Sequence, residues 1–464
     1  MTERLIDIAD TRRQLPNSAC PGLFRIVSAR DGGICRVKLP LGQLSAAKAR
    51  AVADAAARFG SGIVEVTNRA NLQIRGIRGD DAALLTRNLV DAGLGPARPE
   101  ADDVRNVMVS PTAGIDRLQQ IDALPIAREL LAVMQSAEAC RTLSAKFCVL
   151  VDGGESVAAV SHPHDIWLAS MAGRTQMALG LAGAPPTAAD DATPFVAVPA
   201  DLAVGAVAAS LALFAEAAVG DPAMTRFRHL LERTSRIDFF DRLAERLPAV
   251  VERGAEIGAW RRPRPAPLGH VGVGEQRQAG LVFIGAVPPL GRLSPDILVR
   301  LAEIAEEVGD GGVRLTPWQS VILPSVGRAV AARAVAALET AGLICDPAHP
   351  LGSIVACAGT RGCARARSDT KADALALARA LGSGAAARPL IHLSGCAKSC
   401  ACAGVADLTL LAAAPGRYEL FANASDQRSS KFGRPVAGDL TVPQAAERLC
   451  EMTTARSAAV GDRG

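Results

Sequence analysis

The chain has 464 residues, which at roughly 100–200 residues per domain predicts two to four structural units. Its 51 Lys and Arg nearly balance its 47 Asp and Glu, and a single Tyr offers little stacking surface for bases, so nucleic acid is excluded as a partner. Residues 202–214 are apolar but fall short of the roughly 20 residues needed to cross a bilayer. We therefore expect a buried helix there and no membrane partner.

The N-terminus, Met-Thr-Glu-Arg-Leu-Ile-Asp at residues 1–7, carries charges where a secretory signal would be apolar. We therefore expect a cytoplasmic location. In that reducing compartment, the eleven cysteines are expected to be metal ligands, catalytic thiols or core residues rather than disulfides. Six of them fall between Cys345 and Cys402.

A repeat at a spacing of 249 residues organises the chain. It aligns residues 40–67 with residues 289–316 and gives eleven identities in 28 positions without a gap. Each copy predicts a strand, a helix and a second strand. Helix N-caps are expected in both copies, and so are left-handed glycines at the helix ends. These four positions are Ser45, Ser294, Gly60 and Gly309.

Two copies separated by half the chain predict a pseudo-twofold, internally duplicated α+β fold. We expect residues 1–98 and 270–340 to be the two copies of a small half domain, each followed by a module, at residues 99–255 and 341–464. Residues 256–269 are rich in proline, which opposes regular helix, so this stretch is expected to link the halves.

The first copy ends in a row of polar residues that the second copy lacks. On a strand of period two, Leu72 and Ile74 would face the core and the alternate positions would share the other face. A solvated strand edge is the alternative to a binding surface. Two arginines and two amides suit a ligand with several carboxylates, so we favour binding. The predicted binding residues are Arg69, Asn71, Gln73 and Arg75.

Four cysteines form the strongest metal-binding pattern. Five residues separate Cys357 from Cys363, three separate Cys396 from Cys400, and 32 lie between the pairs. Four thiolates are the usual complement of a [4Fe-4S] cluster. Zinc, which usually has tighter spacing on both arms, and a purely structural set of cysteines are the alternatives.

The first half contains the corresponding module without these ligands. The 249-residue shift places Met108 opposite Cys357, and a one-residue adjustment places Lys146 opposite Cys396. We therefore expect one cluster rather than two.

In these motifs the chain resembles the sulfite and nitrite reductase superfamily. The resemblance implies ferredoxin-like half domains in a central unit, two flanking modules of the 4Fe-4S type, and a pocket between the halves. In the reductases this pocket holds siroheme, joined to the cluster through a cysteine at the position of Cys400. The matching pieces are residues 67–76, Arg105-Asn-Val107, Lys146-Phe147, the four cysteines and Ala414-Pro-Gly-Arg-Tyr418.

The resemblance also implies that Arg69, Arg105 and Lys146 would bind an anion. Where the reductases carry a second lysine, this chain has Cys148. The loss should weaken anion reduction, since each charge-assisted hydrogen bond contributes about 1.5–3 kcal/mol. Among the branches of the superfamily, the chain with these departures most resembles precorrin-3B synthase, whose members act in aerobic cobalamin biosynthesis.

That branch implies a monooxygenase that hydroxylates precorrin-3A at C20 and closes a γ-lactone, with dioxygen and an external electron donor. The donor would be NADH through a reductase, or a ferredoxin-type carrier, because no dinucleotide-binding fingerprint is present. A siroheme-dependent sulfite or nitrite reductase is the alternative activity, and only that alternative requires siroheme. A non-catalytic iron–sulfur scaffold or sensor is a third hypothesis.

The branch is also associated with a mononuclear non-haem iron, whose usual ligands are two histidines and a carboxylate. The local cluster of such residues is His162, His164 and Asp165. A surface loop with incidental histidines is the alternative.

Overall fold

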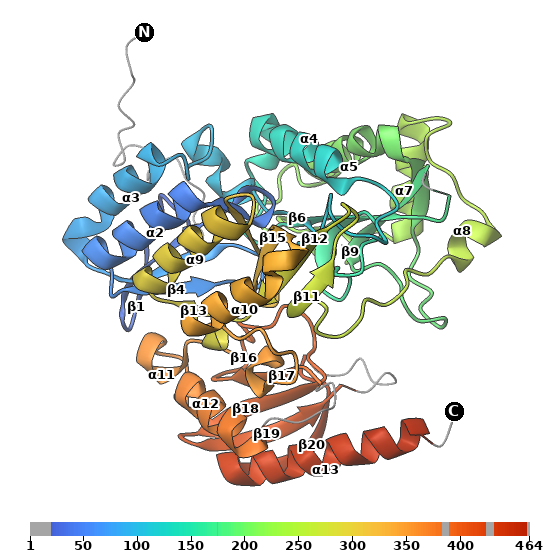
Figure 1. The fold of residues 1–464 in the computed structure, drawn as a ribbon. Helices are drawn as coiled ribbons and strands as arrows, with labels where there is room; N and C mark the ends of the chain where they lie inside the picture. The colour runs from blue at the N-terminus through green and yellow to red at the C-terminus, as the bar shows by residue number, and fades with distance from the viewer. Residues whose placement is uncertain (1–19, 174, 383–388, 424–430, 462–464) are drawn as a thin grey trace.

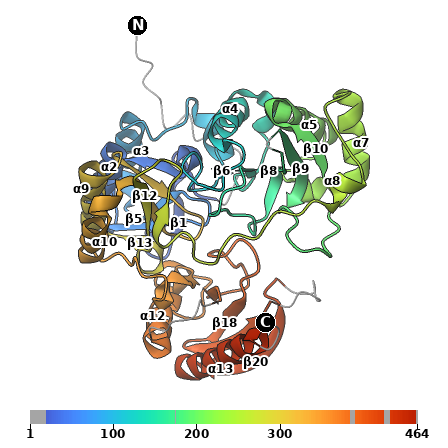
Figure 2. The ribbon, with the colours of Figure 1, turned by 45° about the vertical axis from the view of Figure 1, so that its right-hand side comes forward.

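The structure is a computed structural model that describes residues 20–173, 175–382, 389–423 and 431–461, with side chains of the last helix described as far as Thr453. These residues form four five-stranded sheets flanked by helices. Figures 1 and 2 show a central unit that carries one module beside it and the other below it. The α+β class is thereby confirmed.

The two half domains repeat the same elements at the predicted spacing. The bounds of α2, β4 and α3 become those of α9, β14 and α10 when 249 is added to each residue number. Leu41 and Leu290 even share an unusual positive φ, 53° and 54°. The first copy contains β1 (Val27–Ala29), β2 (Gly32–Val37), β3 (Gln43–Ser45), α2 (Ala46–Phe59), β4 (Ile63–Val66), β5 (Leu72–Ile77) and α3 (Ala82–Asp91). The second contains β11 (Gly272–Glu275), β12 (Leu281–Ala286), β13 (Arg292–Leu293), α9 (Pro295–Val308), β14 (Gly312–Leu315), β15 (Val321–Gly327) and α10 (Ala331–Thr340).

The halves exchange strands. The sheet orders are β1-β2-β5-β4-β13 and β11-β12-β15-β14-β3, so β3 of the first copy completes the second sheet and β13 completes the first. Helices α2 and α9 lie side by side (Figure 1), and one apolar core contains residues of both copies. Because each sheet needs a strand from the other copy, the two half domains form one central unit.

The predicted helix caps are confirmed at the N-terminal ends of the two helices but not at their C-terminal ends. Ser45 and Ser294 accept hydrogen bonds from the backbone of their helices, as predicted. Gly60 and Gly309 end the helices but are extended, so the predicted left-handed conformation is wrong. A Cβ at Gly60 would lie 2.7 Å from the carbonyl oxygen of Arg75, so the glycine is required by close packing.

The two modules share one sheet pattern, with three parallel strands followed by two antiparallel ones. The first contains β6 (Val107–Val109), α4 (Ala123–Ser136), β7 (Val149–Asp152), β8 (His164–Ser170), β9 (Gln176–Gly183), β10 (Val196–Pro199), α5 (Ala203–Ala217), α6 (Phe227–Leu230) and α7 (Arg236–Arg246). The second contains β16 (Ile354–Ala356), α11 (Gly359–Gly362), α12 (Thr370–Leu381), β17 (Ile391–Ser394), β18 (Leu408–Ala414), β19 (Arg417–Ala422), β20 (Arg434–Thr441) and α13 (Val442–Gly461).

The apolar stretch noted in the sequence forms α5. In the described residues, Ala200–Ala217 is the one helical window long and apolar enough to cross a membrane. Val207, Leu211 and Phe214 of this helix are buried in the core of the first module, which explains their apolar character without a bilayer.

The segment between the halves begins with α8 (Ala255–Ala259) and then crosses the first module. Arg262 of this segment forms a buried, two-point ion pair with Asp152, at 2.6 and 3.0 Å. Its guanidinium also donates to the carbonyl oxygen of Glu155. The segment is therefore fixed to the module rather than loosely attached.

Candidate functional site

A cavity of about 760 Å³ lies between the first-half sheet and the module that carries the four cysteines. Strands β1, β2, β4 and β5 supply one wall, and the loops around β16, α11 and β17 supply the other. Glu65 is the only acidic residue among its described lining residues. Such a charge balance suits a ligand with several carboxylates. The basic lining residues are Arg30, Arg36, Arg75, Arg365, Lys371 and Lys398.

All four predicted ligand cysteines line this cavity. The backbone N–H of Gly395 donates to Sγ of Cys357 at 3.2 Å. Burial raises the pKa of the Cys400 thiol, and the neighbouring Cys396 and Cys357 raise it further, so the thiols are within electrostatic reach of one another. These are the donors that an iron–sulfur cluster requires.

Across the described residues, no group of three or more His, Cys, Asp or Glu side chains lies close enough together to hold a metal ion, so zinc and the cluster remain alternatives for the four thiols. Glycine lets a backbone amide approach one of the predicted ligand sulfurs. A Cβ at Gly395 would lie 2.7 Å from Ala366 and 3.3 Å from the Cys357 sulfur, so only glycine brings its amide to the ligand.

Arg75 joins the two walls of the cavity. Its guanidinium forms a two-point contact with Asp31, at 2.8 and 2.9 Å, and a 3.4 Å ion pair with Glu65. It also donates to the carbonyl oxygen of Gly362, next to Cys363, at 3.0 Å. Arg75 therefore lines the cavity with much of its hydrogen-bonding capacity already used.

The predicted polar row is not a single face. The strand begins only at Leu72, and Ala70 has a φ of 52°, so a turn separates Arg69 from the later positions. Asn71 is buried and accepts a hydrogen bond from the backbone of Leu39 at 2.8 Å. Gln73 and Arg75 line the cavity, as expected for alternate positions on a strand, but Asn71 has a structural partner and Arg69 lies elsewhere.

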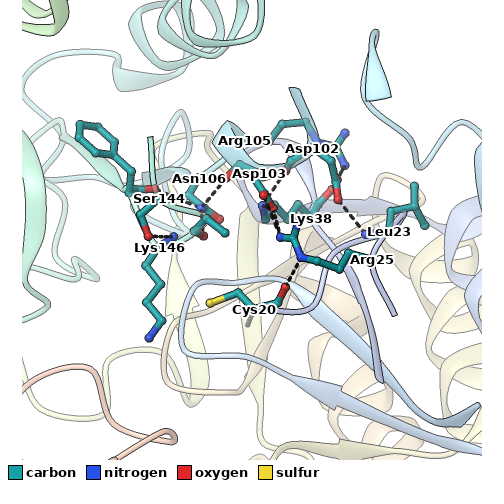
Figure 3. A network of polar contacts seen from close by, with 12 residues as sticks. Cys20, Leu23, Arg25, Lys38, Asp102, Asp103, Arg105, Asn106, Ser144 and Lys146 are labelled. Carbon is teal, nitrogen blue, oxygen red and sulfur yellow. Dashed lines mark hydrogen bonds and ion pairs between the residues drawn. The ribbon is translucent and has the colours of Figure 1, made fainter. Parts of the chain in front are cut away.

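Arg105 lies in a buried network (Figure 3). Its guanidinium donates to the carbonyl oxygens of Lys38, Leu94 and Gly95, at 2.8 to 3.1 Å. These contacts fix the start of the first module to the half domain. Its predicted role in substrate binding therefore remains a hypothesis, and it is not among the cavity-lining residues.

Lys38 is the central cation of the same network. It is 1% exposed, donates to the carbonyl oxygen of Asp102 at 2.6 Å and lies 3.6 Å from the Asp103 carboxylate. Burial lowers the pKa of Lys38 to about 8, although Asp102 and Asp103 oppose this shift. Arg25 binds Asp103 through a single guanidinium nitrogen, at 2.7 and 2.8 Å to its two oxygens.

The remaining predicted cations lie apart. Lys146 is exposed, and its side chain extends away from the network in Figure 3. Arg69 lies close enough to Cys148, His162 and His164 to influence their protonation. Burial raises the pKa of Cys148 to about 12, so this thiol is neutral at physiological pH. The structure therefore does not bring Arg69, Arg105 and Lys146 together on the cavity wall.

The predicted iron ligands have other environments. Asp165 accepts hydrogen bonds from Arg226 at 2.8 Å and from the backbone N–H groups of Cys148 and Phe227. Both ring nitrogens of His164 are buried without a partner, and burial lowers the pKa of His162 to about 4. Together with Asp165 these histidines form no metal-binding group, so the geometry does not support the predicted iron site.

Arg36 is a cavity residue that the sequence did not single out. Its Nη2 donates to Gln73 at 3.0 Å, its Nε is buried without a partner, and burial lowers its pKa. No ion pair joins it to any acid in the described parts of the chain. The repeat could have identified Arg36, because the 249-residue shift places Gly285 opposite it, so only the first copy has a cation at this position.

The second half provides an internal comparison. The shift places Phe283 and Ile322 opposite Ile34 and Gln73 of the cavity. Phe283 and Ile322 are buried in an apolar cluster, so side chains fill the corresponding surface of the second sheet. The two copies therefore differ at this surface, which lines a cavity in the first half and is covered by apolar side chains in the second.

Two family descriptions match the chain. "Nitrite/Sulfite reductase ferredoxin-like half domain" matches residues 28–92 and 274–341, and "Nitrite and sulphite reductase 4Fe-4S domain" matches residues 100–250. The second match covers the module without the four cysteines. Together the descriptions support an iron–sulfur cluster and confirm ferredoxin-like halves. A solved structure of Mycobacterium tuberculosis NirA shares the fold, with a TM-score of 0.70 at 21% identity over 89% of this chain and 79% of its own.

Curated relatives extend the match along the chain. The chloroplastic ferredoxin–nitrite reductase of Zea mays is 32% identical over 80% of this chain and 68% of its own length. The ferredoxin–nitrite reductase of Synechococcus elongatus is 30% identical over 82% of this chain and 76% of its own. A precorrin-3B synthase of Sinorhizobium sp is 28% identical over 90% of this chain and 85% of its own. On these matches and on its fold, this chain belongs to the nitrite and sulfite reductase family.

Proposed function

We propose that this protein is a precorrin-3B synthase, a monooxygenase that converts precorrin-3A to precorrin-3B by hydroxylation at C20 and γ-lactone formation. In this reaction one oxygen atom of dioxygen enters the tetrapyrrole and the other leaves as water, with two electrons from an external donor. The [4Fe-4S] cluster held by Cys357, Cys363, Cys396 and Cys400 would supply one-electron transfer.

The observation that carries the proposal is the state of Cys148. It stands where the resemblance places a cationic lysine of the reductases, but it is a neutral thiol buried in an apolar cluster and does not line the cavity. By resemblance, an anion site that lacks this lysine stabilises a small oxyanion less well. The Sinorhizobium relative supports the same conclusion, because its match covers 85% of its length and 90% of this chain.

The cavity supports a tetrapyrrole as the ligand. Precorrin-3A is a flat macrocycle bearing several carboxylates, and six cations against Glu65 line the cavity. Arg36, on the wall formed by β2, hydrogen-bonds to Gln73, but its Nε has no partner and no described acid forms an ion pair with it. We propose that this surface binds and orients the substrate carboxylates, with Gln73 holding the Arg36 guanidinium in place.

A siroheme-dependent sulfite or nitrite reductase is the second candidate. The specific observation in its favour is the 30–32% identity to ferredoxin–nitrite reductases. The same basic cavity could hold siroheme as a cofactor instead of a tetrapyrrole as a substrate. The two candidates differ in what the purified protein contains and in which substrate it consumes.

The deciding experiment is anaerobic purification, iron and sulfide analysis and a visible spectrum, followed by incubation with precorrin-3A, a reductant and ¹⁸O₂. The synthase proposal expects a cluster without siroheme and one labelled oxygen atom in the product. Siroheme bands together with nitrite- or sulfite-dependent oxidation of a reduced dye, and no oxygen gain, would overturn it.

A matched pair of variants sharpens this test. Cys148→Ala keeps the position neutral and should retain oxygenation, whereas Cys148→Lys restores a cation. Under the reductase alternative, Cys148→Lys should raise anion-dependent dye oxidation relative to Cys148→Ala. If neither variant shows anion-dependent dye oxidation, the result supports the synthase proposal.

A further inference from the structure

Side chains of the central unit hold the cysteine loops from outside their own module. Each donates a hydrogen bond to a backbone carbonyl oxygen of a loop that carries ligand cysteines. The four contacts are Arg30 to Thr360 at 3.2 Å, Arg75 to Gly362 at 3.0 Å, Asn68 to Cys400 at 3.2 Å and Gln319 to Ala401 at 3.2 Å.

Two of these donors come from the same turn in the two repeats. In the first, Thr67 donates its backbone N–H to the carbonyl oxygen of Asn71 at 2.8 Å; in the second, Thr316 donates to Ser320 at 2.9 Å. The third residue after each threonine has a positive φ, 52° at Ala70 and 63° at Gln319. The repeated turn therefore presents an amide from each half domain to adjacent carbonyl groups, one at Cys400 and one at the next residue.

The loop that carries Cys400 has internal contacts on either side of that residue. The hydroxyl of Ser394 donates to the carbonyl oxygen of Cys396 at 2.8 Å, and that of Ser399 donates to the carbonyl oxygen of Cys402 at 3.3 Å. Within it, the backbone N–H of Ser399 reaches the carbonyl oxygen of Cys396 only at 3.5 Å, and Ser399 has a φ of 55°. Lys431, from its own module, donates to the carbonyl oxygens of Ala397 and Lys398. The carbonyls at and just after Cys400 are the ones that the central unit satisfies.

We propose that Asn68 and Gln319 are positioning residues that clamp the Cys400 loop, so that both halves of the repeat jointly hold the fourth cluster ligand. The clamp also adjoins the cavity, because Asn68 and Gln319 both line it. The inference rests on the cluster assignment and is independent of the substrate.

The test uses Asn68→Ala and Gln319→Ala, alone and together, in the full chain with its cluster. Chelator-induced loss of the cluster is followed by absorbance, and the midpoint potential is measured by an EPR-monitored titration. Groups that orient metal ligands typically change metal affinity 10- to 100-fold, so each variant should lose its cluster about tenfold faster. The freed carbonyls should shift the midpoint potential to more negative values.

Asn88→Ala on α3 and Gln135→Ala on α4 are matched controls, because both amides lie away from the cavity. Wild-type rates and potentials in the clamp variants would overturn the proposal. A fall in thermal stability that is equally large when the variant and wild-type chains are compared without the cluster would assign these residues a general structural role and would also overturn it. Cys400→Ser tests the premise separately, because a stable, complete cluster in that variant would refute the ligand assignment itself.

Discussion

Arg75 of β5 donates a 3.0 Å hydrogen bond to the carbonyl oxygen of Gly362, the residue before Cys363. The contact links a strand of the first half domain to a loop almost 300 positions later in the chain. Asp31 and Glu65 hold the guanidinium on the half-domain side. One buried side chain therefore contacts both the cavity wall and the loop that carries Cys363.

Gly362→Ala should break this link. The new Cβ would lie 2.5 Å from Nη2 of Arg75 and 3.2 Å from the Asp31 carboxylate, so either the guanidinium or the loop must shift and the contact is disturbed. We expect a loss of about 1–3 kcal/mol in the free energy of unfolding, measured by urea titration, together with a lower iron content. Gly205→Ala, whose Cβ would meet nothing within 4 Å, is the control and should be neutral or stabilising. An unchanged stability and iron content in Gly362→Ala would show that the contact is dispensable.

Arg36→Gln should weaken tetrapyrrole binding. The substitution removes the cavity cation whose Nε is buried and unpartnered, and a charged hydrogen bond contributes about 1.5–3 kcal/mol. We expect affinity for uroporphyrin, a polycarboxylate probe, to fall about 10- to 100-fold in a fluorescence titration. Arg50→Gln is the control. It removes an exposed cation on α2 that forms an ion pair with Glu306 of α9, and it should leave the affinity unchanged. Equal affinities in the two variants would place the carboxylates elsewhere.

Asp165→Asn should act on stability rather than on metal content. The carboxylate is 2% exposed and is paired with Arg226, so its neutralisation leaves a largely buried guanidinium without its counter-charge. We expect a loss of about 1.5–3 kcal/mol in the free energy of unfolding with no change in iron per chain. Asp241→Asn, in an exposed pair with Arg253, should cost less than about 1 kcal/mol. Loss of one iron from a stably folded Asp165→Asn protein would instead support the predicted iron site.

His270 should make the fold sensitive to acid. It stacks on Trp318 with ring centroids 4.5 Å apart, its Nε2 has no partner, and burial lowers its pKa from 6.5 to about 3. Below about pH 6.5, His270 is therefore protonated in the unfolded chain but stays neutral in the folded chain. The free energy of unfolding should fall by about 1.4 kcal/mol per pH unit toward pH 3.

His270→Phe keeps an aromatic ring against Trp318 but cannot titrate. Urea unfolding at several values between about pH 7 and 4 should give a shallower loss of stability in this variant than in the wild type. Parallel stability curves would mean that folding does not lower the pKa of His270.

The repeat and its local chemistry were predictable because they depend on residues close together in the chain. The shift of 249 residues identified both half domains, and the caps at Ser45 and Ser294 follow from hydrogen bonds within one helical turn. Alternation correctly placed Leu72 and Ile74 in the core. The same alternation predicted that Asn71 would face the ligand. This was wrong, because the prediction extended the strand through a turn that precedes Leu72.

The cysteine spacing by itself predicted a four-thiol site, because the type and number of ligands can be read from the sequence, and the structure places all four cysteines on one cavity. Tertiary structure alone decided which cations face that site. Arg36 and Arg75 reach the cavity, whereas Arg105 binds backbone carbonyls and Lys146 lies at the surface away from it. The physical reason is that the destination of a long charged side chain depends on partners brought close only by folding, such as the carbonyl of Gly362 for Arg75.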